Sequence, residues 1–166
     1  MPAQGRDRGG IGPRLASLAV LAALAAADQA TKAWAFALLP RMHDTRPVLP
    51  PVFSLTHSEN RGIFMGLGGS IGEIFVYTSF GMLAILVWVL WTKPMSWPWR
   101  LSVAAIGSGA LGNGLDRVRL GHVRDFLDVH YRLWVYPTFN LADICICVGA
   151  GVLAIGLWKT PEPGKP

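Results

Sequence analysis

The sequence predicts an all-α integral membrane protein with four transmembrane helices and a small extramembrane β element formed by its outer loops. Apolar residues make up 52% of the chain and charged residues only 15%, whereas charged residues are about a quarter of an average soluble domain. A soluble domain of 166 residues could not bury that much apolar surface, but a lipid bilayer can solvate it. Four apolar stretches also approach the roughly 20 residues that a helix needs to cross a hydrocarbon core about 30 Å thick.

The first predicted span covers residues 15–39 and is interrupted by Asp28, Gln29 and Lys32. Its first half also fits a cleaved secretory signal, because arginines precede an apolar run that ends in three alanines at residues 25–27. The apolar run resumes after Lys32, however, which favours one longer span with the polar residues inside it.

Three further spans are predicted along the chain. The second, residues 71–91, is the most uniformly apolar. The third, residues 101–115, is short, and residues 116–120 can extend it into the membrane interface. The fourth, residues 139–158, carries two polar side chains near its start.

Four spans put both chain ends on one side of the membrane, and the distribution of arginine and lysine favours the cytoplasmic side. The inner segments would then hold seven cations in 30 residues, and the outer loops seven in 52 residues. We therefore expect a cytoplasmic flank at residues 1–14, a four-helix membrane domain at residues 15–158 and a disordered cytoplasmic tail at residues 159–166.

The two outer loops are long, and each contains a stretch in which apolar and polar residues alternate. These stretches are residues 52–57 and 123–132. Such alternation is typical of a half-buried strand. We expect the two loops to form a small sheet together.

The net charge of +5 would suggest nucleic acid in a soluble protein, but the sequence has no basic helix and no basic patch interleaved with aromatic residues. The excess cations lie in short flanks and loops, where anionic lipid headgroups are the expected partners. Cys145 and Cys147 stand two residues apart in an apolar run, so they do not face each other on a helix. No Cys and His spacing fits a zinc site.

Ionisable residues inside a span are costly, so each polar cluster calls for a structural or a functional reason. Asp28 and Lys32 lie four residues apart, in the order that favours an ion pair on a helix. They can neutralise each other so that the helix tolerates two charges, or they can help to place a substrate. Asn60 and Gly62 in the first outer loop form a weak signal, whose simplest interpretation is a glycine-rich turn into the second span.

Two more polar clusters lie at the outer ends of the third and fourth predicted spans. Asn113, Asp116 and Arg117 share one helix face, which fits either a polar network between helices or a functional site. Asn140 and Asp143 stand three residues apart at the start of the fourth span. The carboxylate there is either a lone aspartate bonded to helix-end amides or part of a reactive site.

In this order and on these spans, the four clusters resemble the lipoprotein signal peptidase (signal peptidase II) family. The resemblance covers residues 15–158 and rests on two motifs that are highly specific together: Gly-Asn-x-x-Asp-Arg followed by Asp-Phe within residues 112–126, and Phe-Asn-x-Ala-Asp at residues 139–143. The Asp-Gln-x-x-Lys element of the first span supports it. One departure lies in the first outer loop, where Phe64 and Met65 follow Ile63, whereas family members have two small residues and then Phe.

The resemblance implies an aspartyl endopeptidase that removes the signal peptide from diacylglyceryl-modified bacterial prolipoproteins and cuts before the lipidated cysteine. Its catalytic pair would be Asp125 and Asp143; Asp128 is the rival to Asp125, and the Asp-Phe match selects Asp125. Nine further residues match the family's supporting and substrate-binding positions. They are Asn113, Asp116, Arg117, Asn140, Ala142, Asn60, Gly62, Asp28 and Lys32.

The same resemblance implies a monomer in the bacterial cytoplasmic (inner) membrane, in contact with membrane lipids. Both termini would be cytoplasmic and the active site would lie near the outer face. The chemistry would need no metal and no organic cofactor.

Two other classes of protein also bury carboxylates in membranes. A small four-span transporter working as a dimer would carry carboxylates at mid-membrane between short loops, whereas here they cluster at one end and the outer loops are long. A non-catalytic membrane scaffold would use polar residues only to join helices, so it would tolerate Asp-to-Asn changes at Asp125 and Asp143.

Overall fold

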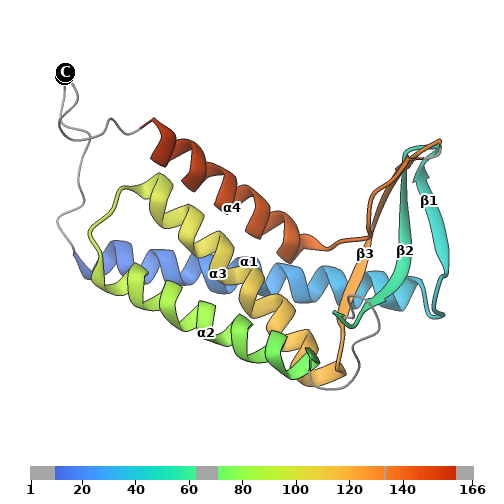
Figure 1. The fold of residues 1–166 in the computed structure, drawn as a ribbon, viewed down its shortest axis with the longest axis horizontal. Coiled ribbons are helices and arrows are strands. Elements are labelled where there is room, and N and C mark those ends of the chain that lie inside the picture. Colours follow the sequence, from blue (N-terminus) through green and yellow to red (C-terminus); the bar gives the residue numbers. More distant parts are fainter. Residues whose placement is uncertain (1–9, 63–70, 133, 160–166) are drawn as a thin grey trace.

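The structure, a computed structural model, describes residues 10–62, 71–132 and 134–159. This part of the chain forms four helices and a four-stranded sheet (Figure 1). The helices are α1 (Ile11–Leu38), α2 (Ile71–Thr92), α3 (Trp97–Leu120) and α4 (Leu141–Trp158). The strands are β1 (Thr45–Leu49), β2 (Phe53–Asn60), β3 (Val123–Tyr131) and β4 (Trp134–Val135).

The four helices coincide with the four predicted spans, and their ends differ by a few residues. α1 begins at Ile11 rather than at residue 15, and it runs unbroken through its polar residues. α3 begins at Trp97, earlier than predicted, because Pro98 is tolerated in the first turn of a helix. α4 begins at Leu141 rather than at residue 139, because the side chain of Asn140 caps it.

Three of these helices are long and apolar enough to cross a membrane: Ile11–Leu38, Glu73–Thr92 and Leu141–Trp158. α3 is not among them, since glycines, serines and polar or charged residues interrupt its apolar run. It packs against each of the other three helices (Figure 1), and 12 of its 24 residues are buried. The polar groups of α3 therefore face protein to a large extent.

Glycines bring α3 close to its neighbours. A Cβ on Gly112 would overlap a carboxylate oxygen of Asp28 in α1, and a Cβ on Gly109 would overlap the carbonyl oxygen of Ala142 in α4. These two positions set the separation at which α1 and α4 meet α3, because small residues let helix backbones approach closely.

The sheet has the strand order β1-β2-β3-β4, and all neighbouring strands are antiparallel. Its central pair joins the two outer loops, since β2 belongs to the first loop and β3 to the second. The predicted sheet built from both loops is therefore confirmed. Leu55 is paired with Leu127 and Ser58 with Asp125, so β2 has one extra residue at this point of the ladder. Such a bulge changes the direction of neighbouring side chains.

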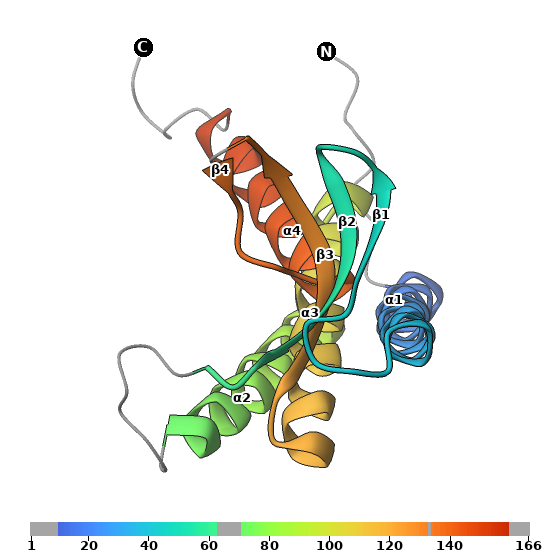
Figure 2. The same cartoon turned by 90° about the vertical axis from the view of Figure 1, so that its right-hand side faces the viewer.

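The sheet lies at the end of the helices where α1 ends and α4 begins (Figures 1 and 2). A buried apolar cluster attaches it to α1: Ala35 lies in the last turn of that helix, Leu39 directly follows the helix, Leu55 comes from β2 and Phe126 from β3. α1 begins and α4 ends at the opposite end of the molecule (Figure 1). The attachment of the sheet fixes the start of β3 close to the ends of α1 and α3 and to the beginning of α4.

Some predicted features lie outside the described residues. They are residues 1–9 of the N-terminal flank, the segment with Ile63, Phe64 and Met65, and residues 160–166 of the tail. The division into flank, membrane domain and tail therefore stays a prediction.

Candidate active site

Buried charged side chains collect where the helices meet the sheet. Asp28 and Lys32 of α1, Asp116 of α3 and Asp125 of β3 are each at most 1% exposed, and Asn140 is fully buried. A buried charge is tolerated only when partners and hydrogen bonds compensate for its lost hydration. The contacts among these side chains therefore determine how the site is held.

Lys32 is the cation on the α1 side of the site. Its Nζ lies 2.8 Å from Asp28 Oδ2 and 3.4 Å from Asp116 Oδ2, and it donates a 2.9 Å hydrogen bond to Asn113 Oδ1. The predicted Asp28–Lys32 ion pair is present, as one part of a larger network that reaches α3. Asp28 Oδ1 also accepts a 2.9 Å bond from the backbone N–H of Ala142, which ties α1 to the first turn of α4.

Asn140 and Asp143 together form the start of α4. The backbone N–H of Asp143 donates to Asn140 Oδ1 and the backbone N–H of Asn140 donates to Asp143 Oδ2, both over 3.1 Å. This reciprocal arrangement is a capping box, which satisfies two amides at the helix end. It holds the Asp143 carboxylate in one orientation and leaves its Oδ1 available to other donors.

Two asparagines connect Asp143 to Asp125. Asn113 Nδ2 donates a 2.9 Å bond to Asp143 Oδ1, and Asn140 Nδ2 donates a 2.6 Å bond to Asp125 Oδ1. Asn140 Nδ2 also lies 3.2 Å from Asn113 Oδ1, which closes the chain of contacts. Asp143 is therefore more than a lone aspartate at a helix end, because it shares a polar site with Asp125.

Asp128, the alternative partner in the sequence, bonds within the sheet instead. It accepts a 2.8 Å bond from Thr56 of β2 and lies 3.3 Å from Nδ1 of His130. Its side chain is 18% exposed, whereas Asp125 is 1% exposed. Of these two aspartates on β3, Asp125 is the one bonded to Asn140.

The surroundings of Asp125 favour its protonated form. Burial, and after it the charge of Asp143, raise the pKa of Asp125 from 3.8 to about 6. Hydrogen bonds from Asn140 and Asn60 and the charge of Lys32 lower the pKa and offset only part of this increase. A carboxyl group with a pKa near 6 can take up and release a proton close to neutral pH.

Arg117 lies one helical turn beyond Asn113 on α3. Its guanidinium carbon is 5.2 Å from the centre of the Phe75 ring of α2, a distance that suits a cation–π contact. Its positive charge also acts on the carboxylates of Asp125, Asp143 and the neighbouring Asp116. It is a cation on the α2 side of the site, as Lys32 is on the α1 side.

Asn60 and Gly62 border the site at the end of β2. Asn60 Oδ1 accepts a 3.0 Å bond from the backbone N–H of Gly62. Gly62 has a φ of 69°, which favours glycine, and a Cβ there would lie 2.7 Å from the Phe75 ring. Gly62 thus lies against the same ring as Arg117. The predicted glycine-rich turn into the second span stays a prediction, because residues 63–70 lie outside the described part of the chain.

Two polar residues of this region were not among the predicted site residues. Gln29 Nε2 donates 3.0 Å bonds to Asp116 Oδ1 and to the carbonyl oxygen of Gly112. Arg124 Nη2 donates a 2.7 Å bond to Asp116 Oδ1. The signals in the sequence were their positions, since Gln29 follows Asp28 inside a span and Arg124 directly precedes Asp125.

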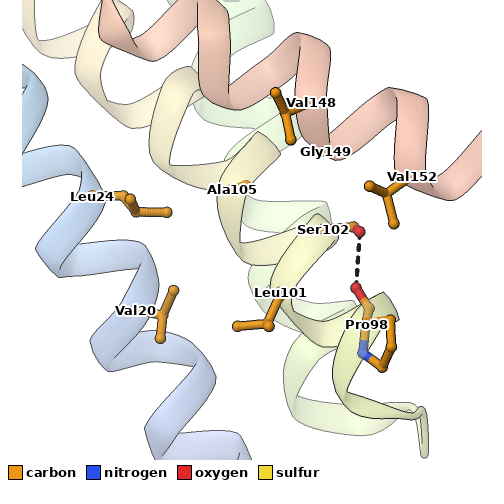
Figure 3. A pocket seen from close by; sticks show the side chains of 9 residues that line it. All are labelled: Val20, Leu24, Pro98, Leu101, Ser102, Ala105, Val148, Gly149 and Val152. Carbon is orange, nitrogen blue, oxygen red and sulfur yellow. Dashed lines mark hydrogen bonds between the residues drawn. The ribbon is translucent and has the colours of Figure 1, made fainter.

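An apolar groove of about 330 Å³ lies elsewhere, between α1 and α4 and over α3 (Figure 3). Its lining is almost entirely apolar and includes Val20, Leu24, Leu101, Ala105, Val148 and Val152. The hydroxyl of Ser102 at its floor donates a 2.8 Å bond to the carbonyl oxygen of Pro98. The groove therefore offers no ionisable group, and we assign the chemistry to the buried polar network.

Among the described residues, no three His, Cys, Asp or Glu side chains are grouped so that they could hold a metal ion. The chemical groups at the site are two neighbouring carboxylates, the amides of two asparagines and the cations around them. Two carboxylates at one site disfavour each other's ionisation, and the charge of Asp143 is one of the causes that raise the pKa of Asp125. A carboxylate beside a carboxylic acid can provide both a base and an acid for a hydrolysis.

The chain is similar to known membrane peptidases over most of its length. The sequence model of the family described as signal peptidase (SPase) II matches residues 20–159. The lipoprotein signal peptidase of Syntrophotalea carbinolica is 35% identical over 146 residues, which cover 86% of this chain and 90% of that protein. The lipoprotein signal peptidase of Clostridium acetobutylicum is 38% identical over 130 residues, which cover 77% of this chain and 84% of that protein.

Solved structures support the same relationship. A bacterial membrane enzyme determined by the in meso method at 1.9 Å resolution superposes with a TM-score of 0.80 at 26% identity, over 88% of this chain and 94% of that chain. A second structure of a bacterial membrane enzyme, at 2.3 Å resolution, gives a TM-score of 0.78 over 90% of this chain and 92% of that chain. The fold is therefore that of a membrane enzyme, and the chain belongs to the lipoprotein signal peptidase (signal peptidase II) family of membrane peptidases.

Proposed function

We propose that this peptidase is an aspartyl endopeptidase that removes the signal peptide from diacylglyceryl-modified bacterial prolipoproteins and cuts before the lipidated cysteine. The observation that carries this proposal is the pair of contacts made by Asn140. Its Nδ2 donates a 2.6 Å bond to Asp125, and its backbone N–H and Oδ1 form the capping box with Asp143. One residue, Asn140, thus bonds to both of the carboxylates that the reaction needs.

In the proposed mechanism, Asp125 and Asp143 share one proton. The ionised carboxylate takes a proton from a water molecule, whose oxygen attacks the scissile carbonyl carbon. The protonated carboxyl group donates a hydrogen bond to the carbonyl oxygen and later gives its proton to the leaving amine. The two protonation steps belong to the pair, so neither aspartate has a fixed role as acid or base. The raised pKa of Asp125, about 6, suits this sharing near neutral pH.

The other predicted site residues support the pair in distinct ways. Asn113 and Asn140 orient the carboxylates by donating to them. Asp28, Lys32 and Asp116 join α1 to α3 behind the pair. The backbone amide of Ala142 holds α4 to this network. On the other side, Asn60, Gly62 and Arg117 border the approach to the pair, where the chain of the substrate would lie.

We propose that all four helices cross the membrane. At about 1.5 Å per residue, the 24 residues of α3 reach about 36 Å, which exceeds a hydrocarbon core about 30 Å thick. Its polar composition is compatible with a span, because the other three helices cover much of it. With both termini cytoplasmic, the sheet and the carboxylates would lie at the outer face of the bacterial inner membrane.

This placement fits the proposed substrate. The two acyl chains of the lipidated cysteine would stay in the surrounding lipid, while the peptide bond before that cysteine reaches the carboxylates at the interface. The proposed enzyme acts as a monomer and uses no metal or organic cofactor, since two carboxyl groups and water complete the proton transfers.

The test is cleavage of a diacylglyceryl-modified prolipoprotein by the purified protein in lipid. Asp125→Asn and Asp143→Asn are compared with wild type, and Asp128→Asn is the matched control on the same strand as Asp125. We expect wild type and Asp128→Asn to cut before the lipidated cysteine, and both other variants to be folded and inactive. Activity in Asp125→Asn would assign the second carboxylate elsewhere, and a folded wild type that never cuts would refute the proposed function.

A further inference from the structure

We propose that Arg124 is a positioning residue of this enzyme: it anchors the start of β3 to α3 and α1, so that the carboxylate of Asp125 stays against Asn140. The inference rests on the proposed function, because it assigns Asp125 to the catalytic pair. It concerns a residue that is neither a member of the pair nor one of the named residues of the two sequence motifs that identify the family.

The first support is the number of bonds that Arg124 makes to one carboxylate. Its backbone N–H and its Nε donate to Asp116 Oδ2 over 3.0 and 3.2 Å, and its Nη2 donates to Asp116 Oδ1 over 2.7 Å. Two parallel bonds from a guanidinium to a carboxylate fix both direction and distance. Because the third bond comes from the backbone, the contact fixes the strand itself as well as the side chain.

The second support is a link from the same guanidinium to α1. Arg124 Nη2 donates a 3.0 Å bond to Gln29 Oε1, and Gln29 Nε2 donates a 3.0 Å bond back to Asp116 Oδ1. Three side chains from α1, α3 and β3 thus form a closed ring of hydrogen bonds. The Asp116 side chain is 0% exposed and the Arg124 side chain 16%, so water competes little for these bonds.

The third support is the place of Asp125 between two anchors. Successive side chains of a strand point to opposite faces, so fixing Arg124 on one face directs Asp125 to the other. After Asp125 along the strand, the backbone N–H groups of Phe126 and Leu127 donate to the carbonyl oxygen of Phe139 over 3.0 and 2.9 Å. Phe139 is the residue before Asn140. The second anchor uses only backbone atoms, so Arg124 supplies the side-chain part of the constraint.

Arg124→Met tests this role, because methionine keeps an unbranched apolar side chain and removes every guanidinium bond. A carboxylate displaced by about 1 Å from a productive geometry loses on the order of 100-fold in rate. We expect kcat to fall by that order while KM changes little, since Arg124 reaches Asp116 and Gln29 rather than the bordering residues Asn60 and Gly62.

The loss of the positive charge gives a second readout. The remaining charged groups around the pair are Asp28, Lys32, Asp116 and Arg117, with Asp125 and Asp143 themselves. Without the positive charge of Arg124, the net charge around the pair becomes more negative, which raises the pKa values of the pair. Both limbs of the pH profile of kcat therefore move to higher pH. Arg124→Lys keeps the positive charge but cannot make two parallel hydrogen bonds to the Asp116 carboxylate. We therefore expect a wild-type pH profile with a reduced kcat.

The control is Arg119→Met, which removes an exposed arginine from the last turn of α3 and leaves kcat and KM at wild-type values. Wild type and Asp125→Asn are assayed first, because an active Asp125→Asn would refute the proposed pair independently of Arg124. With an inactive Asp125→Asn, a wild-type kcat and pH profile in Arg124→Met would overturn the positioning role. If Arg124→Met does not fold, Arg124→Lys decides: a kcat equal to wild type overturns the role, and a fall of about 10-fold or more supports it.

Discussion

Replacing Asp125 by asparagine is expected to stabilise the folded protein above pH 6 while it abolishes cleavage. Asparagine has the shape of aspartate, and its Oδ1 can still accept the 2.6 Å bond from Asn140 Nδ2. What the change removes is the ionisation of a carboxyl group that is 1% exposed and close to Asp143. A catalytic group held in an unfavourable environment reduces stability in just this way.

The size of the effect follows from the pKa of Asp125. This pKa is raised from 3.8 in the unfolded chain to about 6 in the folded protein. Between these values the folded state binds more protons than the unfolded state, so the free energy of unfolding falls as the pH rises through this window. The contribution of Asp125 is fully present below the lower pKa and lost above the higher one. A shift of about 2 units corresponds to at most about 3 kcal/mol.

The assay is thermal or denaturant unfolding of purified wild type and Asp125→Asn in one detergent, at pH 4.0, 5.0, 6.0, 7.0 and 8.0. We expect the variant to gain up to about 3 kcal/mol at pH 8 and close to nothing at pH 4. Asp128→Asn is the control, since its carboxylate accepts a bond from Thr56 in the sheet and its loss should bring no gain. A variant that is no more stable than wild type at pH 8, or whose gain is independent of pH, would refute the reasoning.

Three further changes test the packing and the polar network, each by unfolding in detergent beside the cleavage assay. Gly112→Ala should lower the free energy of unfolding by about 1–3 kcal/mol, because its Cβ would overlap the Asp28 carboxylate. Its control is Gly151→Ala, where a Cβ meets open space and stability should rise by about 0.5–1 kcal/mol. Equal effects of the two changes would contradict the close approach of α1 and α3. Lys32→Met should cost about 3–5 kcal/mol because it leaves two buried carboxylates without this cation, and Asp28→Asn in the same chain should recover part of the loss. Asn140→Ser should keep most of the stability of the folded protein, because serine also caps helices. It should be inactive, because it lacks the Nδ2 group that donates to Asp125. An active variant would contradict the role of that bond.

The helices and the central strands could be predicted because each has its own local signal. Apolar runs marked all four helices, although the run of α3 was short, and the alternation in the two outer loops marked β2 and β3. The helix ends were less accurate, because they depend on side chains such as Asn140, whose capping bond moves the start of α4 two residues along the chain. The short strand β4 and the exposed strand β1 lack both signals, and their pairing with β3 and β2 defines them.

The resemblance to the family named the residues of the candidate site, but the sequence did not show which of them are bonded to one another. The family motifs selected Asp125 and Asp143, because position near the end of a predicted span did not separate Asp125 from Asp128. The bonds from Arg124 and Gln29 to Asp116 could not be derived, because they join positions 8 and 87 residues apart and depend on how the helices cross. The bulge between Leu55 and Ser58, beside Asp125, likewise depends on pairing between two distant loops.

The charges of the assembled site explain why its proposed active state carries one proton. Asp28 and Asp116 are balanced by Lys32 and Arg124, which contact them directly. The pair of Asp125 and Asp143 then has Arg117 as its nearby cation. With one shared proton the pair has a single negative charge, and the site as a whole is neutral. Losing that proton, or gaining a second, would bury a net charge at this place, which is costly away from water. The same arrangement that the fold tolerates best is therefore the one that aspartyl chemistry requires.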